Sequence, residues 1–271
     1  MKVKLLTALV LPVFIGMLAG QAFAQKLVLS GSTTVLPIAQ KAAEVFMNNN
    51  ASADISVRGG GSGVGIAAMI DGTCDIANSS RPIKDTELDK AVANGRKPKA
   101  NVVAMDGICV IVHPSNSVNA LSKKQIKDIY TGSISNWSQL GGPTEKIVVV
   151  SRDSSSGTFE AFGTLALDGS KVRADALMQA SNQAVASTVA QTPGAVGYVG
   201  LGYLTSSVKA VDVDGVKASK ETVLTGKYPI GRPLFMYTNG APTGLAKQLI
   251  DFIMSPEGQK LVEDDGFVAL K

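Results

Sequence analysis

The chain has 271 residues, with 26 lysines and arginines against 22 aspartates and glutamates, and aromatic residues make up only 5% of it. No basic tract stands out, so the composition gives no reason to expect a nucleic acid or an anionic membrane surface as a partner. One histidine and two cysteines cannot supply the closely spaced ligands of a metal site, so we expect no metal and no cofactor.

The N-terminal residues have the features of a secretory signal peptide. An apolar run over 5–20 follows Lys2 and Lys4, and the small residues of "AFA" end this segment at Ala24. A membrane anchor is the alternative, but the apolar run is short for a bilayer. We therefore expect a signal peptide over 1–24, cleavage after its last residue, and a mature protein in the periplasm.

From Lys26 onward, strand-like apolar runs alternate with helical runs, which is typical of an α/β fold. The run "KLVLS" leads into "GSTTVLPIAQKAAEVFMNN", where apolar residues recur at helical spacing and Pro37 fits a first turn. The run "DISVR" leads into "GGGSGVGIAAMIDG", where we expect Ser62 to cap a helix that stops at Gly72. A short strand then ends in "CDIANSSRP", and "IVVVSRD" leads into "SSSGTFEAF". Three times, therefore, a strand is followed by small polar residues and a helix start.

Each of these junctions has the chemistry of an anion site. A helix N-terminus presents free N–H groups and about half a positive charge. Glycines let the backbone approach a ligand closely, and serine and threonine hydroxyls add donors that rotate to suit it. In an open α/β sheet such junctions lie at the carboxyl ends of the strands, where ligands bind. We therefore expect the three junctions to surround one small oxyanion.

Other interpretations of the junctions fit less well. The glycines of "RGGGSGVG" are spaced somewhat like a dinucleotide loop, but Asp75 begins a strand instead of ending the next one. No G-x-x-x-x-G-K-[ST] segment occurs, which argues against a nucleoside triphosphate site. A serine nucleophile in "SSSGT" needs a base, and the only histidine, His113, lies in the strand-like run "ICVIVHPSN". We therefore do not expect an enzyme.

The sequence resembles the phosphate-binding component of bacterial Pst-type ABC transporters through nearly all of the mature chain. The matching segments are "GSTTVLPIA", "GGGSGVGIAAMIDGTCDIANSSRPI", "DGICVIVHPSN", "IYTGSISNWSQLGG", "SRDSSSGTFEAF", "PGAVGYVG" and "SPEGQKLV". The resemblance implies a two-lobed α/β periplasmic binding protein, type II-like, whose chain crosses the hinge twice and closes on its ligand. We expect one lobe from 25–105 and 228–271, and the other from 106–227.

The resemblance also implies which residues hold the ligand. The family's binding positions fall on two threonines and a serine in the first two junctions, and on an arginine and a Ser-Gly-Thr motif in the third: Thr33, Thr34, Ser62, Arg152, Ser156, Gly157 and Thr158. The hydroxyl and amide groups are expected to donate to the anion. The guanidinium is expected to supply the counter-charge, with a planar fork that matches phosphate oxygens.

One position departs from the family's pattern. Where a loop aspartate accepts the proton of hydrogen phosphate, this sequence has Ser80, within "ANSSRPI". A serine can donate or accept, so Ser80 does not by itself exclude sulfate. The acceptor could be Asp106, at the expected crossing between the lobes, or Asp153 beside Arg152. We favour Asp106, because a strand-end carboxylate before Gly107 can face a cleft, whereas Asp153 can pair with Arg152.

The two cysteines, Cys74 and Cys109, lie on strand-like runs. In an oxidising compartment they can form one disulfide or remain two small buried apolar residues. A disulfide requires their Cβ atoms to lie close together, and the sequence leaves both alternatives open.

The sequence therefore predicts a monomeric solute receptor that captures inorganic phosphate in the periplasm and delivers it to a membrane ABC permease. A receptor for another tetrahedral oxyanion, such as sulfate or molybdate, is the first alternative. An exported phosphoester hydrolase with the same anion cradle is the second, and the lack of metal ligands and of a positioned base argues against it. An extracellular scaffold that binds no oxyanion is the third.

Overall fold

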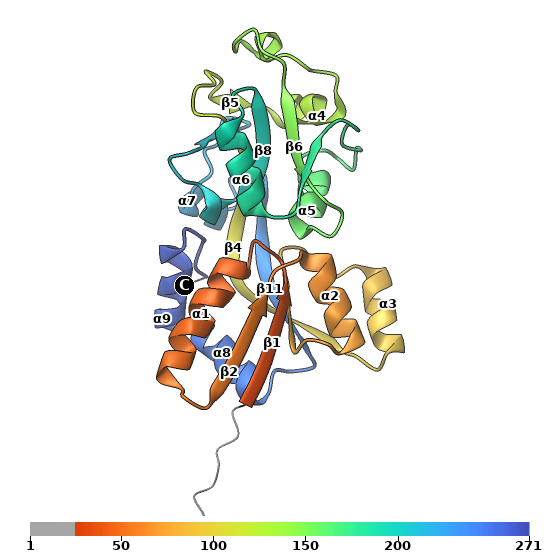
Figure 1. Ribbon diagram of the computed structural model, residues 1–271, viewed down its shortest axis with the longest axis vertical. Coiled ribbons are helices and arrows are strands. Elements are labelled where there is room, and N and C mark those ends of the chain that lie inside the picture. The colour runs from red at the N-terminus through yellow and green to blue at the C-terminus, as the bar shows by residue number, and fades with distance from the viewer. Residues whose placement is uncertain (1–24, 271) are drawn as a thin grey trace, which may run out of the picture.

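The computed structural model describes residues 25–270, which form two lobes joined by two long strands, β4 (Pro98–Val112) and β11 (Gly231–Asn239) (Figure 1). The signal peptide predicted over 1–24 lies outside the described residues. Of the helices within 25–270, none combines the length and the apolar character needed to cross a membrane.

One mixed sheet of nine strands runs through both lobes in the order β2-β1-β3-β11-β4-β8-β6-β7, and β9 pairs with β4. A separate parallel pair is formed by β5 and β10. The remaining strands are β1 (Gln25–Gly31), β2 (Ala53–Arg58), β3 (Ile76–Ser79), β5 (Ala120–Leu121), β6 (Val148–Arg152), β7 (Leu177–Gln179), β8 (Ala195–Gly200), β9 (Lys209–Ala210) and β10 (Asp212–Val213).

Helices cover the sheet in both lobes. In Figure 1, α1, α2, α3, α8 and α9 lie in the lower lobe, and α4 to α7 lie in the upper lobe. The helices are α1 (Leu36–Asn49), α2 (Ser62–Asp71), α3 (Asp85–Ala93), α4 (Lys123–Thr131), α5 (Gly157–Leu165), α6 (Asn182–Gln191), α7 (Lys220–Leu224), α8 (Gly244–Met254) and α9 (Pro256–Asp264), with short 3-10 turns at Trp137–Leu140 and Leu201–Tyr203.

Each lobe has its own hydrophobic core. The main core of the first lobe is built from buried residues within 27–104 and 234–267. The core of the second lobe is built from residues within 108–230, joined by Val268. The lobe boundaries expected from the sequence, after position 105 and before position 228, lie close to these limits. The exact boundaries between the two lobes stay a prediction.

The strand β4 carries the chain from the first lobe into the second. Its first part pairs antiparallel with β11, from Pro98 opposite Asn239 to Gly107 opposite Gly231. Its last part, Ile108–Val112, is fully buried and pairs antiparallel with β8. Because β11 brings the chain back beside β4, the lobes share two neighbouring connections. The predicted fold class, a two-lobed α/β protein, is confirmed.

The three predicted junctions between strand and helix are present. The strand β1 leads into α1, β2 leads into α2, and β6 leads into α5. Within each lobe the strands concerned are parallel, since β1 pairs with β2 and β3, and β6 pairs with β7 and β8. The carboxyl ends of the strands in each lobe therefore lie on one edge, and the two edges face each other between the lobes (Figure 1).

The start of α2 differs from our expectation that Ser62 caps the helix. Gly61, with a φ of 100°, is the N-cap, and Ser62 is the first helical residue. The Ser62 hydroxyl accepts the N–H of Ser80 at 3.0 Å instead. A Cβ at Gly61 would lie 2.5 Å from the carbonyl oxygen of Ser155, so the other lobe leaves no room for a capping side chain. The predicted stop is confirmed, because Gly72 ends the helix in the left-handed conformation.

The two cysteines are free and buried, so the disulfide considered as one alternative is not formed. They belong to different hydrophobic clusters: Cys74 packs near Met69 and Phe235 in the first lobe, and Cys109 lies in the core of the second. Burial raises the pKa of the Cys74 thiol to about 11, and it also raises the pKa of Cys109.

We expect two thiols per chain to react with a thiol reagent when the protein is unfolded without reductant, and both to react slowly in the folded protein. Burial keeps the two thiols protonated and out of reach of the reagent. As the control, a sample that is reduced before unfolding gives the number of thiols expected when no disulfide is present. Absorbance titration yielding no thiol in the unreduced, unfolded protein would establish a disulfide.

Candidate functional site

The N-termini of four helices meet where the lobes face each other: α1 and α2 from the first lobe, and α5 and α6 from the second (Figure 1). The Oγ1 atom of Thr34, before α1, lies 2.9 Å from the Oγ1 atom of Thr158 in the first turn of α5. The side-chain amide of Asn182, the first residue of α6, donates to the hydroxyls of Thr33 and Thr34 at 3.1 and 3.0 Å. These bonds connect junctions that are more than a hundred residues apart in the sequence.

A glycine brings α5 against the serines of the first lobe. A Cβ at Gly157 would lie 2.2 Å from Oγ of Ser62 and 2.9 Å from Oγ of Ser80, so only a residue without a side chain allows this approach. The two serine hydroxyls are themselves 3.4 Å apart. Three chain segments therefore meet at one point, and each brings a hydroxyl or a helix N-terminus to it.

All nine residues predicted for the site are buried, and the structure brings them to the surfaces between the lobes: Thr33, Thr34, Ser62, Ser80, Asp106, Arg152, Ser156, Gly157 and Thr158. Ser156 caps α5, because its hydroxyl accepts the N–H of Phe159 at 3.1 Å. The N–H groups of Gly157 and Thr158, in the first turn, have no partner within the helix and are available to a ligand.

The guanidinium of Arg152 is fixed by the backbone and keeps one nitrogen free. Its Nε and Nη2 atoms donate to the carbonyl oxygens of Gln179 and Ala180, each at 3.0 Å. Its Nη1 atom is buried and has no partner among residues 25–270. Burial lowers the pKa of Arg152. Within these residues Asp153 forms no ion pair with Arg152, contrary to one role considered for it; it accepts the N–H of Ser155 at 2.8 Å.

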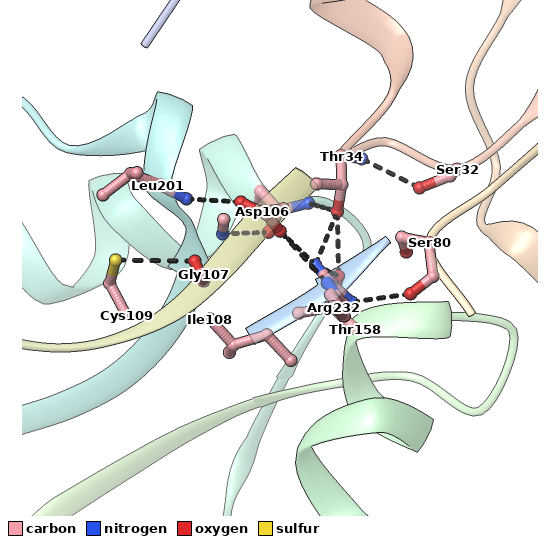
Figure 2. A network of polar contacts seen from close by, with 12 residues as sticks. Ser32, Thr34, Ser80, Asp106, Gly107, Ile108, Cys109, Thr158, Leu201 and Arg232 are labelled. Carbon is pink, nitrogen blue, oxygen red and sulfur yellow. Dashed lines mark hydrogen bonds and ion pairs between the residues drawn. The ribbon is translucent and has the colours of Figure 1, made fainter. Parts of the chain in front are cut away.

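A second buried arginine, Arg232 of β11, lies at the centre of the polar network that Figure 2 shows. Its Nε and Nη2 atoms donate to Oδ2 of Asp106 at 3.0 and 2.9 Å. Its Nη1 atom donates to the carbonyl oxygen of Ser80 at 3.0 Å. Its Nη2 atom also lies 3.3 Å from the hydroxyl of Thr34 and 3.1 Å from that of Thr158. One side chain thus joins both lobes and the crossing strands.

Arg232 and Asn182 were not among the residues predicted from the sequence. For Arg232 a signal was present, because it is the one charged residue in the otherwise strand-like run "YPIGRPLFMY", and a lone charge in a buried strand requires a partner. Asn182 follows Ser181 at a helix start, where polar residues are common as caps. Nothing in its local sequence distinguished it.

The carboxylate of Asp106 is fully buried and already has protein donors on both oxygens. Oδ2 accepts two N–H groups of Arg232, and Oδ1 accepts the N–H of Leu201 at 2.9 Å (Figure 2). Burial raises the pKa of Asp106, while the guanidinium and the Leu201 N–H oppose that shift. These contacts give Asp106 a clear role in holding Arg232. Its role as the acceptor of a ligand proton stays a prediction.

The buried charges of the site do not balance. Arg152 and Arg232 are two buried cations, and among residues 25–270 Asp106 is the only buried carboxylate. A third buried arginine, Arg81, is paired with Glu87 and Glu160 at the rim. Buried ions are costly without a counter-charge, so the excess positive charge and the four helix N-termini favour a small anion. Within the described chain, no group of three or more potential ligand side chains could hold a metal ion.

The lobes are closed over the site by contacts between their facing edges. The N–H of Gly63 donates to the carbonyl oxygen of Ser155 at 2.9 Å, and the Ser155 hydroxyl donates to the carbonyl oxygen of Gly60 at 2.9 Å. At the rim, Glu160 of α5 forms ion pairs with Arg81 and Lys84 at 2.9 and 2.7 Å. A ligand in the site would therefore be enclosed and desolvated.

Known proteins with similar sequences are binding proteins, as the anion-favouring geometry of the site suggests. Residues 19–257 match the PBP superfamily domain. The phosphate-binding protein PstS of Bacillus subtilis is 40% identical over 247 residues, an alignment that covers 89% of this chain and 80% of that protein. The chain belongs to the PstS family of phosphate-binding proteins. PstS of Borreliella burgdorferi is 32% identical over 255 residues, with 90% of this chain and 89% of that protein covered.

Solved structures of similar proteins have the same fold as this PstS family member. A putative phosphate ABC transporter substrate-binding protein from Clostridium perfringens, with bound phosphate, superposes with a TM-score of 0.85 at 36% identity, covering 91% of this chain and all of that one (100%). An ABC-type phosphate transport receptor from Vibrio cholerae superposes with a TM-score of 0.74 at 30% identity, covering 89% and 99% of the two chains.

We expect Asp106→Asn to lower the free energy of unfolding by about 3–5 kcal/mol, because it leaves the Arg232 guanidinium buried without its counter-charge. Urea denaturation of the ligand-free protein measures this loss. The matched control is Asp175→Asn, which removes the exposed partner of Arg173 and should cost clearly less. The double variant Asp106→Asn with Arg232→Met should recover part of the loss. Equal stabilities for the two single variants would contradict the importance of the buried pair.

Proposed function

We propose that this protein binds inorganic phosphate between its two lobes and delivers it to the membrane permease of an ABC transporter. The observation that carries the proposal is the buried, partnerless Nη1 atom of Arg152 in a site with one more buried guanidinium than carboxylate. The names of the relatives, PstS phosphate-binding proteins, and the bound phosphate in the Clostridium perfringens structure support phosphate as the anion. We further propose that the signal peptide directs the protein to the periplasm, where it acts as a monomer.

In this proposal the ligand oxygens are shared among donors from both lobes. Arg152 Nη1 supplies a charge-assisted hydrogen bond, and the N–H groups of Gly157 and Thr158 supply the positive end of α5. The hydroxyls of Ser62 and Ser80 come from the first lobe, and they lie where a Cβ at Gly157 would approach them to 2.2 and 2.9 Å. Because these donors belong to different lobes, the phosphate would be bound most tightly when the lobes are closed.

The same contacts favour a receptor over a phosphoester hydrolase. A serine nucleophile needs a base within hydrogen-bond reach. The only histidine, His113, follows the end of β4, and its Nδ1 atom contacts the hydroxyl of Ser115 at 2.7 Å. Ser62, Ser80 and Ser156 contact backbone N–H groups and other hydroxyls. The serine that contacts a carboxylate is Ser155, beside Asp153, and its hydroxyl bonds the carbonyl oxygen of Gly60 in the contact between the lobes. We therefore assign the site to binding, and a chromogenic phosphoester should remain uncleaved.

We expect Arg152→Met to weaken phosphate binding about ten- to a hundredfold, because one hydrogen bond from a charged group contributes about 1.5–3 kcal/mol. Isothermal calorimetry with phosphate-free protein measures the change. The matched control, Arg173→Met, alters an arginine that pairs with the exposed Asp175, and it should bind phosphate like the unaltered protein. Affinity of Arg152→Met within about threefold of the control would refute the assigned role.

We also expect phosphate to raise the melting temperature of phosphate-free protein, since a ligand at a hundred times its dissociation constant stabilises the folded state by about 2.7 kcal/mol. Scanning calorimetry with phosphate, sulfate and molybdate at equal concentrations separates the oxyanion alternatives. Phosphate should give the largest shift. A larger shift with sulfate or molybdate would assign the receptor to that anion, and no shift with any of the three would favour a scaffold.

A further inference from the structure

The 3-10 turn Leu201–Tyr203, which follows β8, carries a tyrosine that contacts both lobes. Among residues 25–270, Tyr203 is the only partly buried apolar residue that packs against the main cores of both lobes. Its hydroxyl donates to the carbonyl oxygen of Thr33, in the junction between β1 and α1. Because Tyr203 follows β8 of the second lobe and Thr33 belongs to the first, this hydrogen bond joins the lobes at the candidate site.

The direction of this hydrogen bond is fixed by its two groups. A backbone carbonyl oxygen can only accept, so the tyrosine hydroxyl donates. Burial raises the pKa of Tyr203 to about 12, although the charge of Arg152 opposes the shift. The hydroxyl therefore keeps its proton at neutral pH, and the Thr33 carbonyl keeps its donor.

The turn that carries Tyr203 is held in place by its own neighbours. The N–H of Leu201 donates to Oδ1 of Asp106 at 2.9 Å. A Cβ at Gly202 would lie 2.3 Å from Cε2 of Phe267, so only a glycine lets the turn approach the C-terminal segment of the first lobe this closely. The position of the tyrosine hydroxyl is therefore set by packing on both lobes.

The carbonyl that Tyr203 binds belongs to the peptide unit between Thr33 and Thr34, and this unit is held at both ends. The N–H of Thr34 donates to Oγ of Ser32 at 3.1 Å, while the carbonyl oxygen accepts from Tyr203. A peptide unit is planar and includes both flanking Cα atoms, so its orientation sets the directions in which the two threonine side chains leave the backbone. Their hydroxyls meet the side-chain amide of Asn182 at 3.1 and 3.0 Å.

We infer that Tyr203 is a positioning residue for phosphate binding, which orients the peptide unit between Thr33 and Thr34 from the second lobe. This inference rests on the proposed function. Thr33 is buried, so without the tyrosine hydroxyl its carbonyl oxygen loses a donor that solvent does not readily replace. The peptide unit is then free to turn, and a carbonyl oxygen that turns toward the site brings a partial negative charge to the anion.

The test compares Tyr203→Phe with Tyr228→Phe, using calorimetry of phosphate binding and the melting temperatures of the phosphate-free proteins. Tyr228 is the matched control, because its buried hydroxyl also donates to a backbone carbonyl oxygen, that of Ile108 at 2.9 Å, but within the second lobe. Each variant removes one hydroxyl and one hydrogen bond of the same kind. A purely structural role for Tyr203 predicts that both variants lower the melting temperature and that neither changes the phosphate affinity.

We expect Tyr203→Phe to weaken phosphate binding about fivefold, the loss that corresponds to one hydrogen bond between neutral groups. Tyr228→Phe should bind phosphate like the unaltered protein. A protein with 4-aminophenylalanine in place of Tyr203 has an N–H donor at the same position of the ring. It should therefore recover most of the affinity that Tyr203→Phe loses.

A loss of less than about threefold for Tyr203→Phe relative to Tyr228→Phe would overturn the inference. A larger loss that 4-aminophenylalanine does not recover would also overturn it, since the ring and not its donor would then matter. In both cases phosphate binding by the unaltered protein leaves the proposed function intact. Absence of phosphate binding in the unaltered protein would instead overturn the proposed function, and the inference with it.

Discussion

The guanidinium of Arg232 and the carboxylate of Asp106 meet at 2.9 Å where solvent has no access, and the rest of the site is arranged around them. The pair follows from strand register, because Arg232 on β11 lies directly opposite Asp106 on β4. Burying two charges is costly, and it is tolerated here because each is also hydrogen-bonded to its surroundings. Held by Asp106, the Arg232 guanidinium also contacts the carbonyl oxygen of Ser80 and the hydroxyls of Thr34 and Thr158, which belong to different lobes.

Around this pair the protein uses donors that belong to the backbone or are held by it. Arg152 is fixed by two carbonyl oxygens, Asn182 by a backbone N–H, and α5 by the cap of Ser156. Such donors lose little freedom when a ligand arrives, so less of the binding free energy is spent on ordering them. The donors of the site are therefore preorganised within each lobe.

The fold and the three junctions that form the candidate site could be predicted from local patterns. The repeated order of strand, small polar residues and helix start places Thr34, Ser62 and Thr158 at helix N-termini, and all three are buried in the candidate site. Arg232 and Asn182 could not be found in the same way, because their roles depend on neighbours that are distant in the sequence. The capping of α2 was predicted wrongly for the same reason: the backbone of Ser155, from the other lobe, occupies the space beside Gly61.

Two glycines, Gly107 and Gly231, face each other where β4 and β11 pass between the lobes, one residue from the buried ion pair of Asp106 and Arg232. A rotation of the lobes about these two strands would therefore have its axis close to that pair. Contacts near a rotation axis change little in length, and contacts on a long lever arm change most. The ion pair of Arg232 can therefore persist in open and closed forms alike. The contacts of Ser155 with Gly60 and of Glu160 with Arg81 join the two lobes directly, so these are the contacts that opening of the lobes has to break.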